Sequence, residues 1–178
     1  ERTIYKPRTV AEEVERIEIK YKPIIYLIDG YNLMYFLDEL KDTVSSNFLM
    51  AREKVIDLVC DFKGYVNADV VLVFDAYRQE YSKPQISDNE LITVVYTRSL
   101  QTADTYIENA ARDLSDKYKV ITVTNDHLEQ LRVFSNDSFR LSCGEFMKRY
   151  ENMKKACVQK ELPKNKPLSD LRKLLENE

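Results

Sequence analysis

The feature that most constrains this chain is an alternation of short, unbroken apolar runs with helical patterns. The runs lie at residues 24–28, 70–74, 91–96 and 120–124. Continuous apolar runs of this length are typical of strands that are buried on both faces of a sheet. Apolar residues recur at helical spacing over residues 48–62 and 103–114, and a further helix is expected after Asp126. This order predicts an α/β domain with three layers, in which helices cover both faces of a mostly parallel sheet.

The length of 178 residues suits one domain with appendages. Residues 1–23 are polar and are interpreted as an N-terminal arm or linker, and residues 24–150 as the domain. A short strand at 139–141 and a helix at 144–160 are expected near its end. Residues 151–178 form a basic C-terminal tail that is predicted to be helical.

Composition excludes several classes of site. The chain has three glycines, which leaves no Gly-rich phosphate loop, and one histidine and three cysteines without a CxxC pair, which argues against zinc. No apolar run approaches the ~20 residues of a bilayer helix, so no membrane partner is expected. The cysteine pattern is typical of reduced thiols, and a cytoplasmic location is predicted.

Acidic side chains follow three of the predicted strands. Asp29, Asp75 and Asp126 come directly after or just beyond these runs. Because the carboxyl ends of parallel strands share one edge of a sheet, these three side chains are expected to converge there. Asp104 and Glu108, one turn apart on the next helix, can face the same crevice, and Asn32 adds an amide.

Each acid alone has a structural explanation, as a turn residue, a helix N-cap or a first-turn carboxylate. Together they are harder to explain, because clustered carboxylates repel one another unless a cation offsets their charge. An oxygen-only set of ligands suits Mg²⁺ or Mn²⁺. The pattern therefore predicts metal-assisted hydrolysis of a nucleic-acid backbone.

At these positions the chain resembles the YacP-like branch of the NYN domains, which share the PIN-like nuclease fold. The resemblance rests on Asp29-Gly30-Tyr31-Asn32, on Thr102-Ala103-Asp104 through Glu108, and on the elements around Asp75 and Asp126. It implies a metal-dependent endoribonuclease that cleaves mRNA in association with the ribosome. Asp29, Asp75, Asp104 and Asp126 would be its acidic centre, with Asn32 and Glu108 in support.

Within this set, Asp29, Asp104 and Asp126 are the expected metal ligands. Two positions depart from the family pattern: Gln101 stands where a Glu is common, and Asn125 where a Ser is common. The N-terminal arm is similar to the junction that precedes this domain in fusions with a translation-factor-like GTPase.

Basic and aromatic residues are further candidates for contacts with RNA or with the acids. Arg52 can reach the acids or a phosphate, or form a surface ion pair. The residues Arg78, Tyr81 and Lys83, beyond Asp75, can bind RNA by stacking and charge, or belong to an ordinary solvated loop. A catalytically silent module that binds RNA or the ribosome is the alternative function. The oligomeric state is left open.

Overall fold

The computed structural model describes residues 22–76, 84–88, 91–125 and 138–161. Its centre is a six-stranded sheet with the order β3-β4-β2-β1-β5-β6. Five strands are parallel: β1 (Ile24–Asp29), β2 (Asp69–Phe74), β4 (Thr93–Tyr96), β5 (Lys119–Val123) and β6 (Ser138–Leu141). The edge strand β3 (Gln85–Asp88) runs antiparallel to β4. The predicted mostly parallel sheet is confirmed.

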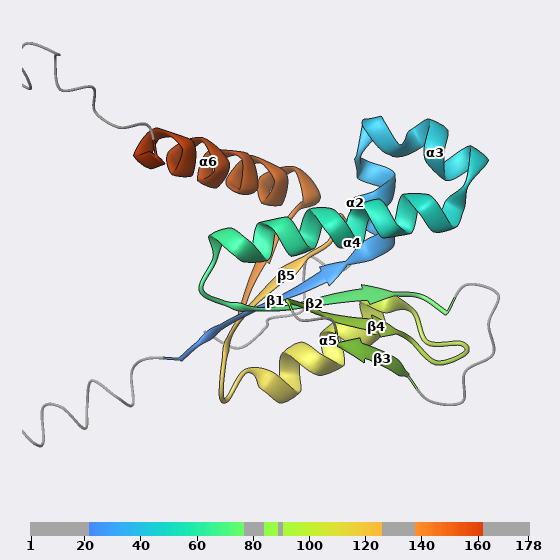
Figure 1. Ribbon diagram of the computed structural model, residues 1–178. Helices are drawn as coiled ribbons and strands as arrows, with labels where there is room; N and C mark the ends of the chain where they lie inside the picture. Colours follow the sequence, from blue (N-terminus) through green and yellow to red (C-terminus); the bar gives the residue numbers. More distant parts are fainter. Residues whose placement is uncertain (1–21, 77–83, 89–90, 126–137, 162–178) are drawn as a thin grey trace, which may run out of the picture.

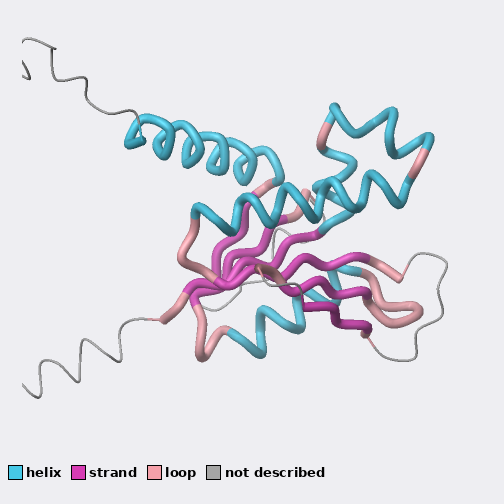
Figure 2. The backbone as a smooth tube through the Cα atoms, in the orientation of Figure 1, coloured by secondary structure: helices cyan, strands magenta, loops and turns pink. Residues whose placement is uncertain are grey.

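Helices cover both faces of this sheet, as Figures 1 and 2 show. One face carries α2 (Gly30–Phe36), α4 (Phe48–Tyr65) and α6 (Cys143–Glu161), with η1 (Asp38–Leu40) and α3 (Lys41–Ser46) between α2 and α4. The other face carries α5 (Ala103–Leu114). The domain is therefore the predicted three-layer α/β/α structure.

Alternating side chains of β1 supply the two cores on the two faces. Tyr26 and Ile28 pack in the core under α2, α4 and α6, whereas Ile25 and Leu27 pack in the core under α5. All four are buried, which explains the continuous apolar run in the sequence.

The sequence predicted the long elements better than the short ones. Strands β1, β2 and β5 and helices α4 and α5 lie where they were expected, and α6 extends the expected 144–160 by a residue at each end. Strand β4 begins at Thr93, two residues later than the run at 91–96, and β3 was not predicted. The helix expected after Asp126 lies outside the described residues.

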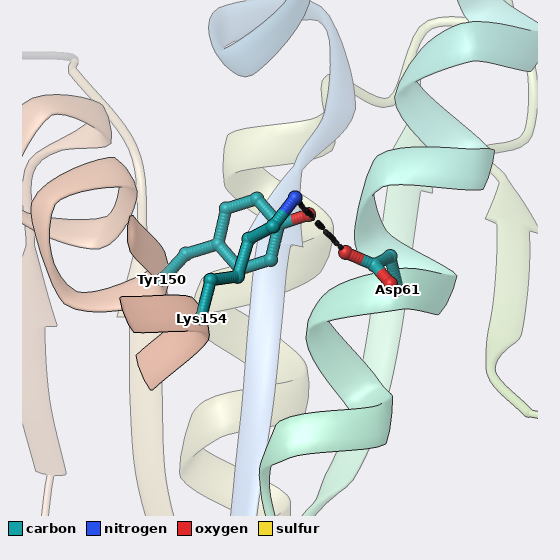
Figure 3. Close-up of polar contacts among 3 residues, drawn as sticks. All are labelled: Asp61, Tyr150 and Lys154. Carbon is teal, nitrogen blue, oxygen red and sulfur yellow. Dashed lines mark hydrogen bonds and ion pairs between the residues drawn. The ribbon is translucent and has the colours of Figure 1, made fainter. Parts of the chain in front are cut away.

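Helix α6 is fixed to α4 by both apolar and polar contacts. Phe146 is fully buried, and its ring contacts that of Phe62 at a centroid distance of 4.7 Å. Tyr150 donates a hydrogen bond to Asp61 on α4, and Lys154 Nζ lies 3.5 Å from the same carboxylate (Figure 3). The helix continues past residue 150, so the separate tail at 151–178 stays a prediction. None of the helices in the described ranges has the length and apolar character of a membrane span.

Candidate active site

Asp29, the last residue of β1, lies at the carboxyl edge of the sheet. Its backbone is extended and it serves as the N-cap of α2, with Oδ1 accepting a hydrogen bond from the backbone N–H of Asn32 at 2.9 Å. Gly30 follows because α2 passes against β2: a Cβ at this position would overlap the fully buried Phe74 ring. The Asp-Gly pair thus places a carboxylate directly at the strand end.

Asn32 links two neighbouring strand ends. Its side-chain Nδ2 donates to Asp29 Oδ2 at 2.7 Å and to Thr124 Oγ1 at 3.3 Å. Thr124 follows β5, whose Val123 is in register with Ile28 of β1, so Thr124 and Asp29 are at the same level of the edge. Asn32 therefore holds the Asp29 carboxylate in one orientation, and its supporting role in a catalytic centre stays a prediction.

Asp75 directly follows β2, the neighbour of β1 on the other side. Its carboxylate accepts a hydrogen bond from the backbone N–H of Ala103, the first residue of α5. Thr97 completes this junction and is fully buried: its N–H donates to Phe74 O at 2.9 Å, and its hydroxyl donates to Gln101 O at 2.6 Å and accepts from the Ala76 amide at 3.1 Å. The start of α5 is thereby fixed against the end of β2.

Both strand-end carboxylates are in an environment that disfavours their charge. Asp29 is only 5% exposed, and burial raises its pKa above the ordinary value; the Asn32 hydrogen bonds oppose this rise, and the charge of Asp75 adds to it. Burial also raises the pKa of Asp75, against the effect of the Ala103 hydrogen bond. Within the described residues, no Lys or Arg forms an ion pair with either carboxylate.

The remaining predicted acids are only partly placed. Asp104 lies in the first turn of α5, next to the residue that Asp75 binds, and Glu108 is one turn further on; both are partly exposed. Asp126 lies outside the described residues, as do Arg78, Tyr81 and Lys83. No group of three or more metal-ligating side chains occurs in the part of the chain that the structure describes. The full acidic centre, and its metal site, therefore stay predictions.

Arg52 lies at the same edge, on α4. Its guanidinium carbon is 5.0 Å from the centroid of the Tyr96 ring, and that ring stacks on Phe74, the residue before Asp75. The Tyr31 ring also contacts the Phe74 ring, and the two ring centroids are 5.0 Å apart. The surface ion pair considered for Arg52 is not formed with any described residue.

Sequence reasoning missed the roles of three residues at this edge. These are Tyr31, which lies in the Asp29-Gly30-Tyr31-Asn32 motif, and Thr97 and Thr124, to which the sequence assigns no role of their own. Nothing in a single threonine marks it as a junction residue, but Thr97 follows a predicted strand end, where buried polar side chains gather. A fourth group, the buried Cys143 thiol, has its pKa raised to about 12 by burial and by the Asp29 charge, so it is protonated at neutral pH.

A wide groove opens beside these residues on the α2–α6 side. It has a volume of about 1450 Å³ and reaches Asn32 and Asn125 at the sheet edge. Tyr35, Lys54 and Lys155 are among the side chains that line it. The groove is large enough for an extended ligand to lie next to Asn32, whereas Asp29 itself is not among the residues that line it.

Comparison with known proteins places the chain in a family. The model of the YacP-like NYN domain matches residues 26–178. The chain is 30% identical over 132 residues to the uncharacterized protein YacP of Bacillus subtilis, a match that covers 74% of this chain and 77% of the relative.

Solved structures agree with this match. The crystal structure of Rae1 (YacP) from Bacillus subtilis has a TM-score of 0.62 at 25% identity, over 88% of this chain and 90% of that one. The crystal structure of a point mutant of the same protein has a TM-score of 0.64 at 26% identity, over 81% and 85% of the two chains. The extent of the match to the family model, with the shared fold, shows that the chain belongs to the YacP-like NYN family.

Proposed function

We propose that this protein is a metal-dependent endoribonuclease that hydrolyses phosphodiester bonds in RNA. NYN domains are related to the PIN-like nucleases, which makes RNA the first substrate to consider. The observation that carries the proposal is the pair of strand-end carboxylates, Asp29 and Asp75, which lie near each other without a protein cation among the described residues. A fold that needed these groups for stability alone would be expected to neutralise them.

The donor set at this edge fits a hard divalent cation. Carboxylate oxygens are the ligands that Mg²⁺ and Mn²⁺ prefer, and no described histidine or cysteine thiolate competes, because the nearby Cys143 is protonated. Asp29 and Asp104, together with Asp126, would hold the ion. When bound, such an ion supplies an activated water and offsets charge on the phosphate oxygens.

Neighbouring residues of the chain orient the proposed metal ligands. Asn32 holds Asp29 through two hydrogen bonds, so both carboxylate oxygens keep one direction. Asp75 and Thr97 fix the first turn of α5 and, with it, the position of Asp104. Glu108 would support this centre from the next turn of α5.

RNA would reach this edge as an extended strand. The groove beside Asn32 offers room for it, and Arg78, Tyr81 and Lys83 are proposed to contact it by charge and stacking. The family resemblance suggests mRNA on the ribosome as the substrate, and cytoplasm as the location. The basic C-terminal tail, residues 151–178, would add attraction to phosphates.

The test is cleavage of a defined RNA by the purified chain with Mg²⁺ or Mn²⁺, with and without ribosomes, followed by mapping of the new ends. Asp104→Asn should abolish the cuts and leave the melting temperature unchanged, because the amide keeps the shape of the carboxylate. Arg112→Met, on the exposed side of α5, is the matched control and should cut like the wild type. Equal cleavage by Asp104→Asn would show the acidic centre to be wrong.

A silent module that binds RNA or the ribosome is the second candidate. It is favoured by the structural roles that Asp29 and Asp75 have in any case, as the cap of α2 and as the acceptor for Ala103. Binding without cuts, both in free RNA and on ribosomes, would support this alternative.

A further inference from the structure

The corner between α2, α4 and the end of β4 holds polar groups that the protein does not satisfy. Tyr31 Oη and Arg52 Nε are covered from solvent, and neither has a hydrogen-bond partner among the described residues. Burial raises the pKa of Tyr31, and Arg52 opposes this rise by hydrogen bonding to the hydroxyl and by its charge, although the contact falls outside the geometry of an ordinary hydrogen bond. Buried donors without partners are rare in native proteins and call for an explanation.

The Arg52 side chain is held in place by aromatic rings. Its guanidinium lies over Tyr96, which stacks on Phe74 with an angle of 18° between the planes, and Phe74 is fixed in the core. Stacking of this kind fixes the plane in which a guanidinium presents its N–H groups. The Arg52 residue as a whole is partly exposed although Nε is covered, so a ligand can reach part of the residue from the solvent side.

The chemistry of this corner selects an anionic acceptor. Arginine offers N–H donors and no acceptor, and a tyrosine hydroxyl can donate as well. No described carboxylate pairs with Arg52, so its positive charge is not offset within the described residues. Phosphate oxygens, which match the guanidinium fork, are the acceptors that this arrangement suits best.

This corner lies close to the acidic edge of the sheet, where Asp29 ends β1 and Asp75 follows β2. Tyr31 is two residues after Asp29, and the charge of Asp75 acts on its hydroxyl. A phosphate bound here would therefore lie next to the strand-end carboxylates without sharing their ligands.

We propose that Arg52, Tyr31 and Tyr96 form a binding site for a backbone phosphate that flanks the bond to be cleaved. Arg52 donates to the phosphate oxygens, Tyr31 adds a hydroxyl donor, and Tyr96 keeps the guanidinium oriented. The inference rests on the proposed function, because it takes RNA as the ligand.

The experiment measures binding without cleavage, in the full chain carrying Asp29→Asn. The probe is a fluorescein-labelled, unstructured single-stranded RNA of about ten nucleotides, which exceeds the ~4-nucleotide minimum of a single-strand site, and the readout is anisotropy over a series of salt concentrations. Adding Arg52→Met should weaken binding about tenfold or more, because a charged hydrogen-bonded pair is lost. It should also reduce the slope of log affinity against log salt by about 0.7, the contribution of one phosphate contact on a single strand.

Two more variants distinguish the effect of the Arg52 charge from the effect of the guanidinium shape and of the Tyr31 hydroxyl. Arg52→Lys should keep the salt slope and lose part of the affinity, whereas Tyr31→Phe should weaken binding about two- to fivefold with an unchanged slope. Arg112→Met is the control for loss of a positive charge elsewhere and should leave affinity within about twofold. Should Arg52→Met melt below the assay temperature, Arg52→Gln, which can still stack on Tyr96, is judged by the same criterion.

Two failures are distinguishable. If Arg52→Met and Arg112→Met have the same affinity and salt slope, the phosphate site is wrong and the nuclease proposal stands. If the Asp29→Asn protein binds no RNA and the wild type cuts none, both proposals fall.

Discussion

Asp61 and the pair Asp29 and Asp75 have opposite surroundings in this molecule. At the α4–α6 junction, Asp61 accepts a hydrogen bond from Tyr150 and lies 3.5 Å from Lys154, so the protein supplies its own donor and cation (Figure 3). At the carboxyl edge of the sheet, burial raises the pKa of both Asp29 and Asp75, the charge of Asp75 adds to the rise at Asp29, and neither carboxylate has a cation among the described residues.

The difference is the one that the proposed function expects between a structural carboxylate and a carboxylate that holds a metal ion. Asp61 is balanced within the fold and fastens one helix to another. Burial raises the pKa of Asp29 and so disfavours its charged form, and under the proposed function a cation from outside would offset that charge. The variants below test that contrast, in order of the size of the expected effect.

The largest effect is expected for RNA cleavage by Asp29→Asn. The amide can still cap α2, but it loses the negative charge that would hold a divalent ion, so the rate should fall about 10³-fold or more. Asp61→Asn removes a charge of the same kind at the junction and should cut within about twofold of the wild type. Equal losses of cleavage rate in the two variants, measured with Mn²⁺, would show that Asp29 and Asp61 do not differ in function.

The next effect concerns the rigidity of the acidic edge. Gly30→Ala should reduce the free energy of unfolding by about 1–3 kcal/mol, because the new methyl group overlaps the buried Phe74 ring. Gly64→Ala, on α4, is the matched control, since a Cβ there meets no atom within 4 Å. It should be neutral or stabilise the protein in chemical denaturation, and a loss equal to that of Gly30→Ala would argue against the close contact.

A smaller effect is expected at the junction. Tyr150→Phe removes the hydrogen bond to Asp61 and keeps the ring packed, so stability should fall by about 1 kcal/mol. RNA cleavage should be unchanged, because the junction is not part of the proposed centre. A large loss of activity without a loss of stability would mean that Tyr150 has a role in the site.

The smallest effect is the pH dependence of stability without metal. The pKa of Asp29 is raised in the folded state, so protonation favours folding, and the cost of its charge disappears as the pH falls through the raised pKa. Asp29→Asn should therefore be more stable than the wild type near neutral pH, and the gap should close toward the ordinary pKa of 3.8. Urea denaturation at several pH values measures this difference in the free energy of unfolding. A difference that grows toward acidic pH would contradict a raised pKa of Asp29.

Much of this architecture was predictable because its elements are long and regularly patterned. The apolar run before Asp29 and the helical stripe that contains Val55 and Val59 each have one structural interpretation. Helix α2 was not predicted because Asp29-Gly30 is also a turn signal, and only the tertiary contact with Phe74 shows why the glycine is needed.

The candidate site was predictable only in outline. Strand-end acids follow from topology, so the sequence alone predicts that Asp29 and Asp75 lie at one edge of the sheet. The roles of Thr97, Thr124 and Tyr31 depend on partners that are distant in sequence, such as Phe74 and Asn32, and no local pattern encodes those contacts.

The claim that the acidic edge takes a divalent cation is tested most directly by the melting temperature of the full chain with and without Mn²⁺. At about ten times the dissociation constant, the ion should add about 1.4 kcal/mol of stability and raise the melting temperature of the wild type by about 3–6 °C. Asp61→Asn should show the same rise, and Asp29→Asn should show none. An equal rise in all three proteins, or no rise in the wild type at millimolar Mn²⁺, would contradict the account.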